Sequence, residues 1–169
     1  MNCLGQFHIA IDQSNFFLHN HSLYCAVLWK DLEGVENKSI STSVKRYSKH
    51  TRKEMLDFSE KIDLRFLLAV LNSKYASVLL TSVRAGVYHI YPEHIRNIPI
   101  PKIPEKKQKP FVELVDKVLG GKENGQDTTA LEKQIDNLVY RFYELTYDEV
   151  KVIDPDFELS EQEYEAIKL

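Results

Sequence analysis

The chain has 169 residues, with 22 Lys and Arg against 25 Asp and Glu, a formal net charge of −3 and 43% hydrophobic residues. This length suits one domain with a small appended part, and the near-average hydrophobic content excludes a wholly disordered chain. Two cysteines are too few for a disulfide framework, and charged residues interrupt the most apolar stretch, 62–83, so we expect a cytoplasmic protein that has no contact with a membrane.

The first part of the chain is predicted to be rich in strands. Residues 7–12 alternate apolar with polar or small side chains, and 16–18 and 23–29 have the composition of further strands. Residues 31–60 lack clear periodicity and are predicted to form a loop, with one helical turn over 53–58. Residues 87–91 alternate again, and Pro92 should end that strand because proline cannot donate to a strand ladder.

One long helix is predicted over 63–80, where leucines and other apolar residues recur at spacings of three and four. Asp63 can cap its first turn. The three prolines at 99, 101 and 104 then predict a stiff, extended connector over 98–104, which is the best internal boundary in the sequence.

Two helices should follow this connector as an antiparallel hairpin. Pro110 suits a first helical position before an apolar stripe that ends at Gly120, and Thr129 with Glu132 can form a capping box for the second helix. Two further Ser/Thr-x-x-Glu pairs, at 146–149 and 160–163, predict two short acidic helices.

The predicted fold class is therefore α+β, with a small strand-rich part around one long helix followed by the helical hairpin. We expect residues 1–104 to form the first part, 105–150 the hairpin and 151–169 an acidic tail.

The net charge is unevenly distributed along the chain. Residues 144–169 hold nine acidic residues and two lysines, a net charge of −7, which leaves +4 for residues 1–143. Residues 38–53 hold six cations and no acid, and this basic segment also contains Tyr47 and His50. Such a segment is typical of a surface that follows a phosphate backbone, although it is also compatible with a plain solvated loop.

Four stretches resemble the C-terminal specificity region of bacterial adenine-specific DNA methyltransferases of restriction-modification systems, of the Taq type and the fused type IIG enzymes. They are residues 67–74, residues 91–103 with Tyr-Pro-Glu and Asn-x-Pro-x-Pro, residues 109–117, and residues 130–140 with Leu-Glu-x-x-Ile-Asp. In this order they lie within residues 63–154, a range that makes up more than half of the chain. The first 60 residues have only a general likeness to this region and share no motif with it.

The resemblance implies a DNA target recognition domain without its catalytic domain. The Asn/Asp-Pro-Pro-aromatic tetrapeptide of such enzymes is missing, since 97–100 reads Asn-Ile-Pro-Ile, and so is the glycine motif for S-adenosylmethionine. We therefore expect no catalytic residue, no metal and no cofactor in this chain. The S-adenosylmethionine would bind a methyltransferase domain supplied in cis or in trans, and the parent enzyme could also be an endonuclease.

Under this hypothesis double-stranded DNA is the partner. The predicted phosphate contacts are Lys45, Arg46, Lys49, Arg52 and Lys53. The candidates for reading base edges are Arg84, which lies beside Gly86, then His89 and Arg96. For Arg84, a structural interaction with the carbonyls at a helix C-terminus is an equal alternative.

Other functional patterns are incomplete. His19 and His21 could share an ion, but a nuclease of that type needs a whole ββα-metal unit, and Glu149-Val150-Lys151 lacks the upstream Pro-Asp of a metal nuclease motif. The main alternative is a protein-docking module of a restriction or phage-defence complex, in which residues 105–169 form the docking surface and the basic segment is only solvated.

Overall fold

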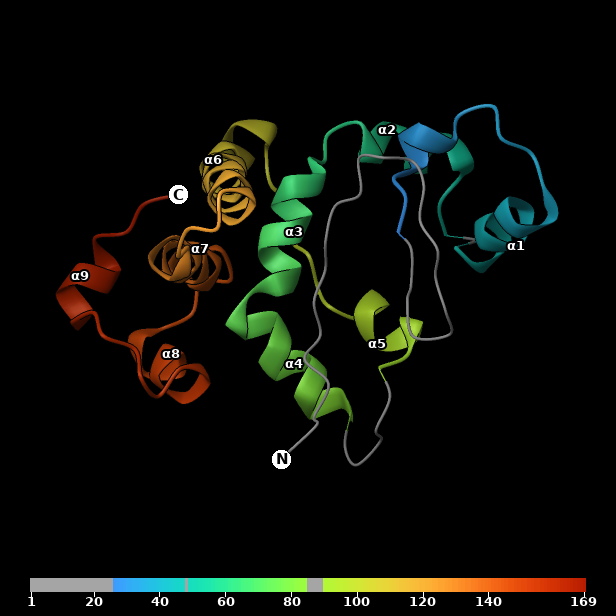
Figure 1. Ribbon diagram of the computed structural model, residues 1–169. Helices are drawn as coiled ribbons and strands as arrows, with labels where there is room; N and C mark the ends of the chain where they lie inside the picture. The colour runs from blue at the N-terminus through green and yellow to red at the C-terminus, as the bar shows by residue number, and fades with distance from the viewer. Residues whose placement is uncertain (1–25, 48, 85–89) are drawn as a thin grey trace, which may run out of the picture.

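The computed structural model describes residues 26–47, 49–84 and 90–169, and their regular structure is entirely helical (Figure 1). The elements in chain order are the 3-10 helix η1 (Trp29–Leu32) and the α-helices α1 (Lys38–Arg46), α2 (Arg52–Ser59), α3 (Leu64–Asn72), α4 (Lys74–Arg84), α5 (Pro92–Arg96), α6 (Glu105–Glu123), α7 (Thr129–Phe142), α8 (Tyr147–Ile153) and α9 (Glu161–Glu165).

The predicted α+β class is therefore wrong for the described residues. The strands predicted at 7–12 and 16–18 lie outside them. Of the strand predicted over 23–29, residues 26–28 carry no strand and Trp29 begins η1, where the amide of Asp31 bonds to the carbonyl of Leu28 at 3.1 Å. Apolar residues in a short run do not distinguish a strand from a tight helical turn, because only a pairing partner makes a strand.

The loop predicted over 31–60 contains two helices, because each has its own side-chain cap. The Asn37 side chain accepts a hydrogen bond from the amide of Ile40 at the start of α1, and Thr51 and Glu54 form a capping box at the start of α2. The single helical turn expected at 53–58 is confirmed and extended to a helix of eight residues.

The long helix predicted over 63–80 is two helices that meet at Ser73 with a bend of 63°. The backbone of Ser73 is extended, with φ −67° and ψ 157°. Its buried hydroxyl donates to the carbonyl of Val70 at 2.7 Å and accepts from the amide of Ala76 at 3.2 Å. Ser73 thus ends α3 and caps α4.

No single helix in the described ranges combines the length and the apolar character that crossing a membrane requires. The bent pair α3 and α4 passes that test only when the two are taken together.

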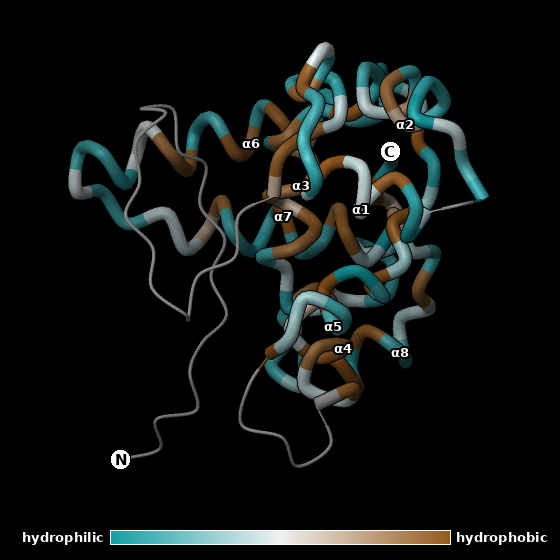
Figure 2. The backbone as a smooth tube through the Cα atoms, turned by 90° about the vertical axis from the view of Figure 1, so that its right-hand side faces the viewer, coloured by the Kyte–Doolittle hydropathy of each residue, from teal (hydrophilic) through white to brown (hydrophobic). Residues whose placement is uncertain are grey.

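The main core lies where α3 meets α6 and α7, and the apolar residues of the three helices converge there (Figure 2). Phe66 of α3 is fully buried and makes edge-to-face contacts with Phe111 of α6 and Phe142 of α7, at centroid distances of 5.3 and 5.4 Å. Such pairs add to the stabilisation from burial. The expected hairpin of α6 and α7 is confirmed.

The hairpin helices begin differently from the prediction. Pro110 lies five residues inside α6, which starts at Glu105. Thr128 rather than Thr129 precedes α7, and the side chain of Asp127 accepts the amide hydrogen bond of Thr129 at 2.9 Å. The capping boxes predicted at 146–149 and 160–163 are confirmed at the starts of α8 and α9.

Two side chains, the buried Gln108 and the half-buried Tyr143, tie the first part of the chain to this core. Gln108 of α6 accepts from the amide of Asp63 at 2.9 Å and donates to the carbonyl of Lys61 at 2.7 Å, so it fixes the connection between α2 and α3. Tyr143 donates to the carbonyl of Pro99 at 2.7 Å and holds the connector against the end of α7. Residues 99–104 of that connector carry no regular structure, as predicted.

Candidate nucleic-acid interface

The basic segment 38–53 occupies the end of the molecule that is formed by α1, α2 and the turn between them (Figure 1). No residue of α1 is buried, and Lys45 and Arg46 lie exposed in its last turn. Lys49 and Lys53 are exposed as well. The predicted phosphate contacts therefore come from one small region of the surface.

None of these five cations has an ionic partner among the described residues, and four of them have no side-chain hydrogen bond there either. Lys45, Arg46, Lys49 and Lys53 are absent from the ion pairs of residues 26–47, 49–84 and 90–169. A cation without a partner carries only its own hydration and counterions, which an external phosphate can replace. We call these four residues the free basic cluster.

Arg52 has a different environment. Its Nη2 donates to the carbonyls of Leu32 and Val35, at 2.9 and 2.8 Å, and its side chain is half-buried. Arg52 thereby holds the segment between η1 and α1 against α2. Its predicted phosphate contact stays a prediction, and any such contact would have to use the remaining donors of the guanidinium group.

The candidates for reading bases are only partly described. Arg84 ends α4, but its side chain lies outside the described part of the structure, and so does His89. Arg96 is in α5 and forms an ion pair with Glu93 at an N–O distance of 3.0 Å. Helix α5 lies on the same side of α3 and α4 as α1 and α2, opposite α7 (Figure 1).

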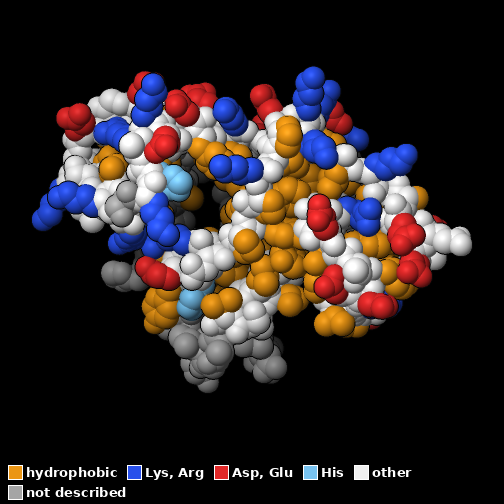
Figure 3. Space-filling view, turned by 180° about the vertical axis from the view of Figure 1, so that it is seen from behind, with side chains coloured by type: hydrophobic (Ala, Val, Ile, Leu, Met, Phe, Trp, Pro, Cys, Tyr) orange, Lys and Arg blue, Asp and Glu red, His pale blue; other side chains and the backbone are white. Residues whose placement is uncertain are grey.

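The acidic tail is far from the free basic cluster. Helices α8 and α9 pack beside α7, at the opposite end of the molecule from α1 (Figure 1). The ion pairs of the tail are formed by Glu158 with Lys133 at 2.7 Å and by Asp154 with Lys74 at 2.8 Å. From behind, blue side chains gather over α1 and at the start of α6, whereas red ones lie both at the α8–α9 end and among the blue ones at the α1–α2 end (Figure 3).

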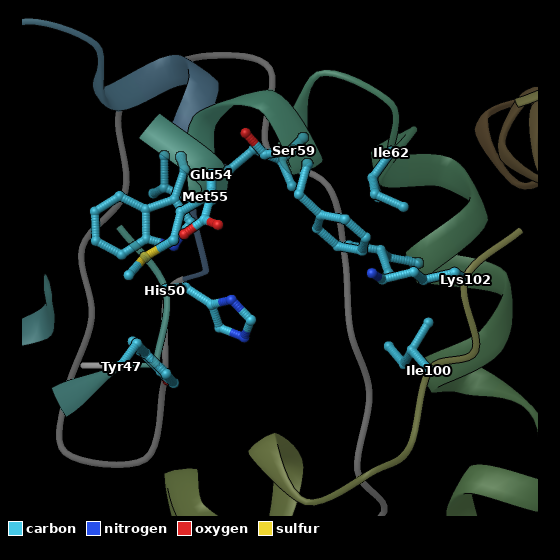
Figure 4. A pocket seen from close by; sticks show the side chains of 13 residues that line it. Tyr47, His50, Glu54, Met55, Ser59, Ile62, Ile100 and Lys102 are labelled. Atoms are coloured by element: carbon cyan, nitrogen blue, oxygen red, sulfur yellow. The ribbon is translucent and has the colours of Figure 1, made fainter. Parts of the chain in front are cut away.

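A groove of about 700 Å³ lies beside the free basic cluster, between α2, η1 and the connector to α6 (Figure 4). We call it the α2 groove. Among the described residues its lining is mainly apolar and includes Val27, Leu28, Trp29, Tyr47, His50, Glu54, Met55, Phe58, Ser59, Ile62, Leu67, Ile100 and Lys102.

Aromatic rings and one lysine dominate the accessible part of the α2 groove. Tyr47 is 38% exposed and Phe58 is 45% exposed. The Lys102 ammonium lies 5.7 Å from the centre of the Phe58 ring, within the range of a cation–π contact. His50 projects into the groove from the α1–α2 turn (Figure 4). The groove therefore brings exposed aromatic rings, a lysine and a histidine together at one site.

The carboxylate in the lining, Glu54, is bound to its own helix. It accepts hydrogen bonds from the amide of Thr51 at 2.7 Å and from its hydroxyl at 2.9 Å, which lower the pKa of Glu54 below its usual value. Glu54 is therefore anionic at neutral pH and has a structural role.

The α2 groove was not predicted from the sequence. Its walls come from segments around residues 28, 55 and 101, and only the tertiary fold brings these together. The available signal was the presence of Tyr47 and His50 between the cations of the basic segment.

No group of three or more His, Cys, Asp or Glu in the described ranges is placed to hold a metal ion, and His19 and His21 lie outside those ranges. Comparison with protein-family models, with curated proteins and with solved structures gave no match to this chain.

Proposed function

We propose that this chain binds double-stranded DNA as the target recognition part of a restriction-modification adenine-N6 DNA methyltransferase. A methyltransferase domain, in cis or in trans, would supply the S-adenosylmethionine chemistry. The proposal joins the sequence resemblance over 63–154 to one structural observation, the free basic cluster at the end of the molecule away from the acidic tail.

The separation of charge supports this proposal despite the net charge of −3. Screening limits electrostatic interactions in physiological salt to about 8 Å, so the distant tail cannot cancel the attraction of the cluster for a nearby phosphate. The acidic tail would also orient the protein, because it repels DNA from the α8–α9 end.

The two groups of predicted site residues have separate roles in this proposal. Phosphate contacts from Lys45, Arg46, Lys49 and Lys53 set the register on the duplex, and Arg52 positions the segment that presents them. The base edges would be contacted by Arg84, His89 and Arg96. Arg96 would exchange its ion pair with Glu93 for a base edge.

The experiment is a fluorescence-anisotropy titration of the chain against a mixed-sequence duplex at about 50 mM salt. The triple variant K45Q/R46Q/K49Q should bind at least about tenfold more weakly than the wild type, since several phosphate contacts are lost. K117Q/K122Q/K168Q is the matched control, because it makes the same change in net charge at exposed sites outside the cluster. Equal weakening by both variants would mean that only total charge matters.

The docking alternative concerns the C-terminal helices. Val152 of α8 is 82% exposed at the acidic end of the molecule, but a single exposed apolar residue does not mark a docking surface. If the wild-type chain binds no DNA at about 50 mM salt, the DNA proposal fails and docking becomes the better account of the C-terminal helices.

A further inference from the structure

We propose that the α2 groove holds one unstacked base of the bound DNA, while Lys102 at its edge holds a flanking phosphate. This inference rests on the proposed function and names a second contact mode within it. In this second mode the groove binds a single-stranded or extrahelical nucleotide, whereas the free basic cluster contacts the phosphate backbone of the duplex.

The walls of the groove have the chemistry that binds bases without regard to sequence. Tyr47 and Phe58 present exposed rings, and Trp29 lines the same cavity. A base stacks on such rings because every base has a π-face. The volume of about 700 Å³ lies within the range of pockets for small ligands and can take a base together with its sugar.

Charge decides between a nucleotide and an apolar peptide as the occupant. Lys102 lies over Phe58 inside the groove, and His50 projects into it from the turn that carries Lys49 (Figure 4). Tyr47 directly follows Lys45 and Arg46 in the chain. The carboxylate of Glu54 in the same lining is already held by Thr51, which leaves Lys102 as the charged group of the described lining that can meet a phosphate. A planar ring that carries a phosphate would use both the apolar walls and Lys102, whereas an apolar peptide would use only the walls.

Trp29 provides a built-in reporter, because it is the only tryptophan of the chain and it lines the groove. A base stacked in the groove should quench its fluorescence. The probe is a 12-nucleotide oligo(dT), and its control is a 12-unit abasic oligodeoxynucleotide, which keeps the phosphates and lacks the bases.

We expect saturable quenching by oligo(dT) and binding of the abasic oligomer that is about 5- to 100-fold weaker, as the loss of stacking implies. Phe58→Leu and Tyr47→Leu should each reduce oligo(dT) binding and leave binding of the abasic oligomer unchanged. Tyr91→Leu, which removes an exposed ring outside the groove lining, should change neither.

Equal affinity for oligo(dT) and the abasic oligomer would overturn the inference, and so would oligo(dT) binding that is insensitive to both leucine variants. If matched duplex still binds in a manner that depends on Lys45, Arg46 and Lys49, the proposed function survives that result. If a hydrophobic dye in the groove is displaced by an amphipathic peptide but not by oligo(dT), the occupant is a protein segment instead.

Discussion

Asp136 of α7 accepts a hydrogen bond at 2.8 Å from the backbone amide of Lys74, the first residue of α4. The side chain of the same lysine forms an ion pair with Asp154 at 2.8 Å. Lys74 thus joins the start of α4, just after the bend at Ser73, to α7 and to the segment that follows α8.

Asp136→Asn should stabilise the protein at neutral pH. Burial raises the pKa of Asp136 to about 6, and the nearby Asp154 and Glu132 add to this effect. Because the folded state binds this proton more tightly than the unfolded chain does, the carboxyl group favours folding at low pH. That contribution disappears as the pH rises through about 6.

Asparagine keeps an oxygen for the Lys74 amide and removes the buried charge. We expect the free energy of unfolding of Asp136→Asn, measured in urea at pH 7, to exceed that of the wild type by about 1 kcal/mol. The difference should shrink toward pH 4. Asp136→Ala, which loses the acceptor, should be less stable than Asp136→Asn at both pH values. If the difference between Asp136→Asn and the wild type is the same at pH 7 and pH 4, the pKa of Asp136 is not raised.

Ser73→Ala should destabilise the bend between α3 and α4. The variant leaves the amide of Ala76 without its acceptor at a buried position, and loss of such a cap costs about 1–2 kcal/mol. Thermal unfolding followed by circular dichroism measures the effect. Ser77→Ala, at an exposed position of α4, is the control and should unfold within about 0.5 kcal/mol of the wild type.

Arg52→Ala should loosen the segment between η1 and α1. The two carbonyls that Arg52 binds, those of Leu32 and Val35, would lose their donor, and we expect faster cleavage by protease around 33–37. Lys53→Ala is the neighbouring control, because Lys53 is exposed and has no ionic partner among the described residues. Equal cleavage rates for the two variants would show that Arg52 does not hold this segment.

Phe66→Ala should cost about 3–5 kcal/mol, because Phe66 is fully buried between Phe111 and Phe142. Phe58→Ala, whose ring is 45% exposed, should cost far less. Chemical denaturation of both variants measures the loss in free energy of unfolding. Comparable losses for Phe66→Ala and Phe58→Ala would mean that the α2 groove is part of the core.

Local sequence signals predicted the C-terminal half of the fold well. The capping boxes at Thr146 and Ser160 were predicted correctly because each is completed within four residues. The same local signal at Thr51 and Glu54 starts α2, within the region that was predicted as a loop. The break at Ser73 could not be predicted from periodicity, since Leu71 and Tyr75 continue the spacing of four across it.

The candidate site was only half predictable for a related reason. The cations of 38–53 are adjacent in sequence, and their exposure follows from their charge. The contacts of Arg52 with Leu32 and Val35 depend on how η1 packs against α2, and the α2 groove depends on how the connector near Lys102 returns to α2. These are long-range contacts, on which residue spacing gives no information.

The salt dependence of duplex affinity tests the central claim most directly. The logarithm of the association constant should fall linearly with the logarithm of salt concentration, with a slope of about −0.9 per phosphate contact. The account predicts that K45Q/R46Q/K49Q lowers the magnitude of this slope by about 2–3, while K117Q/K122Q/K168Q leaves it unchanged. A slope for K45Q/R46Q/K49Q equal to that of the wild type would contradict the account.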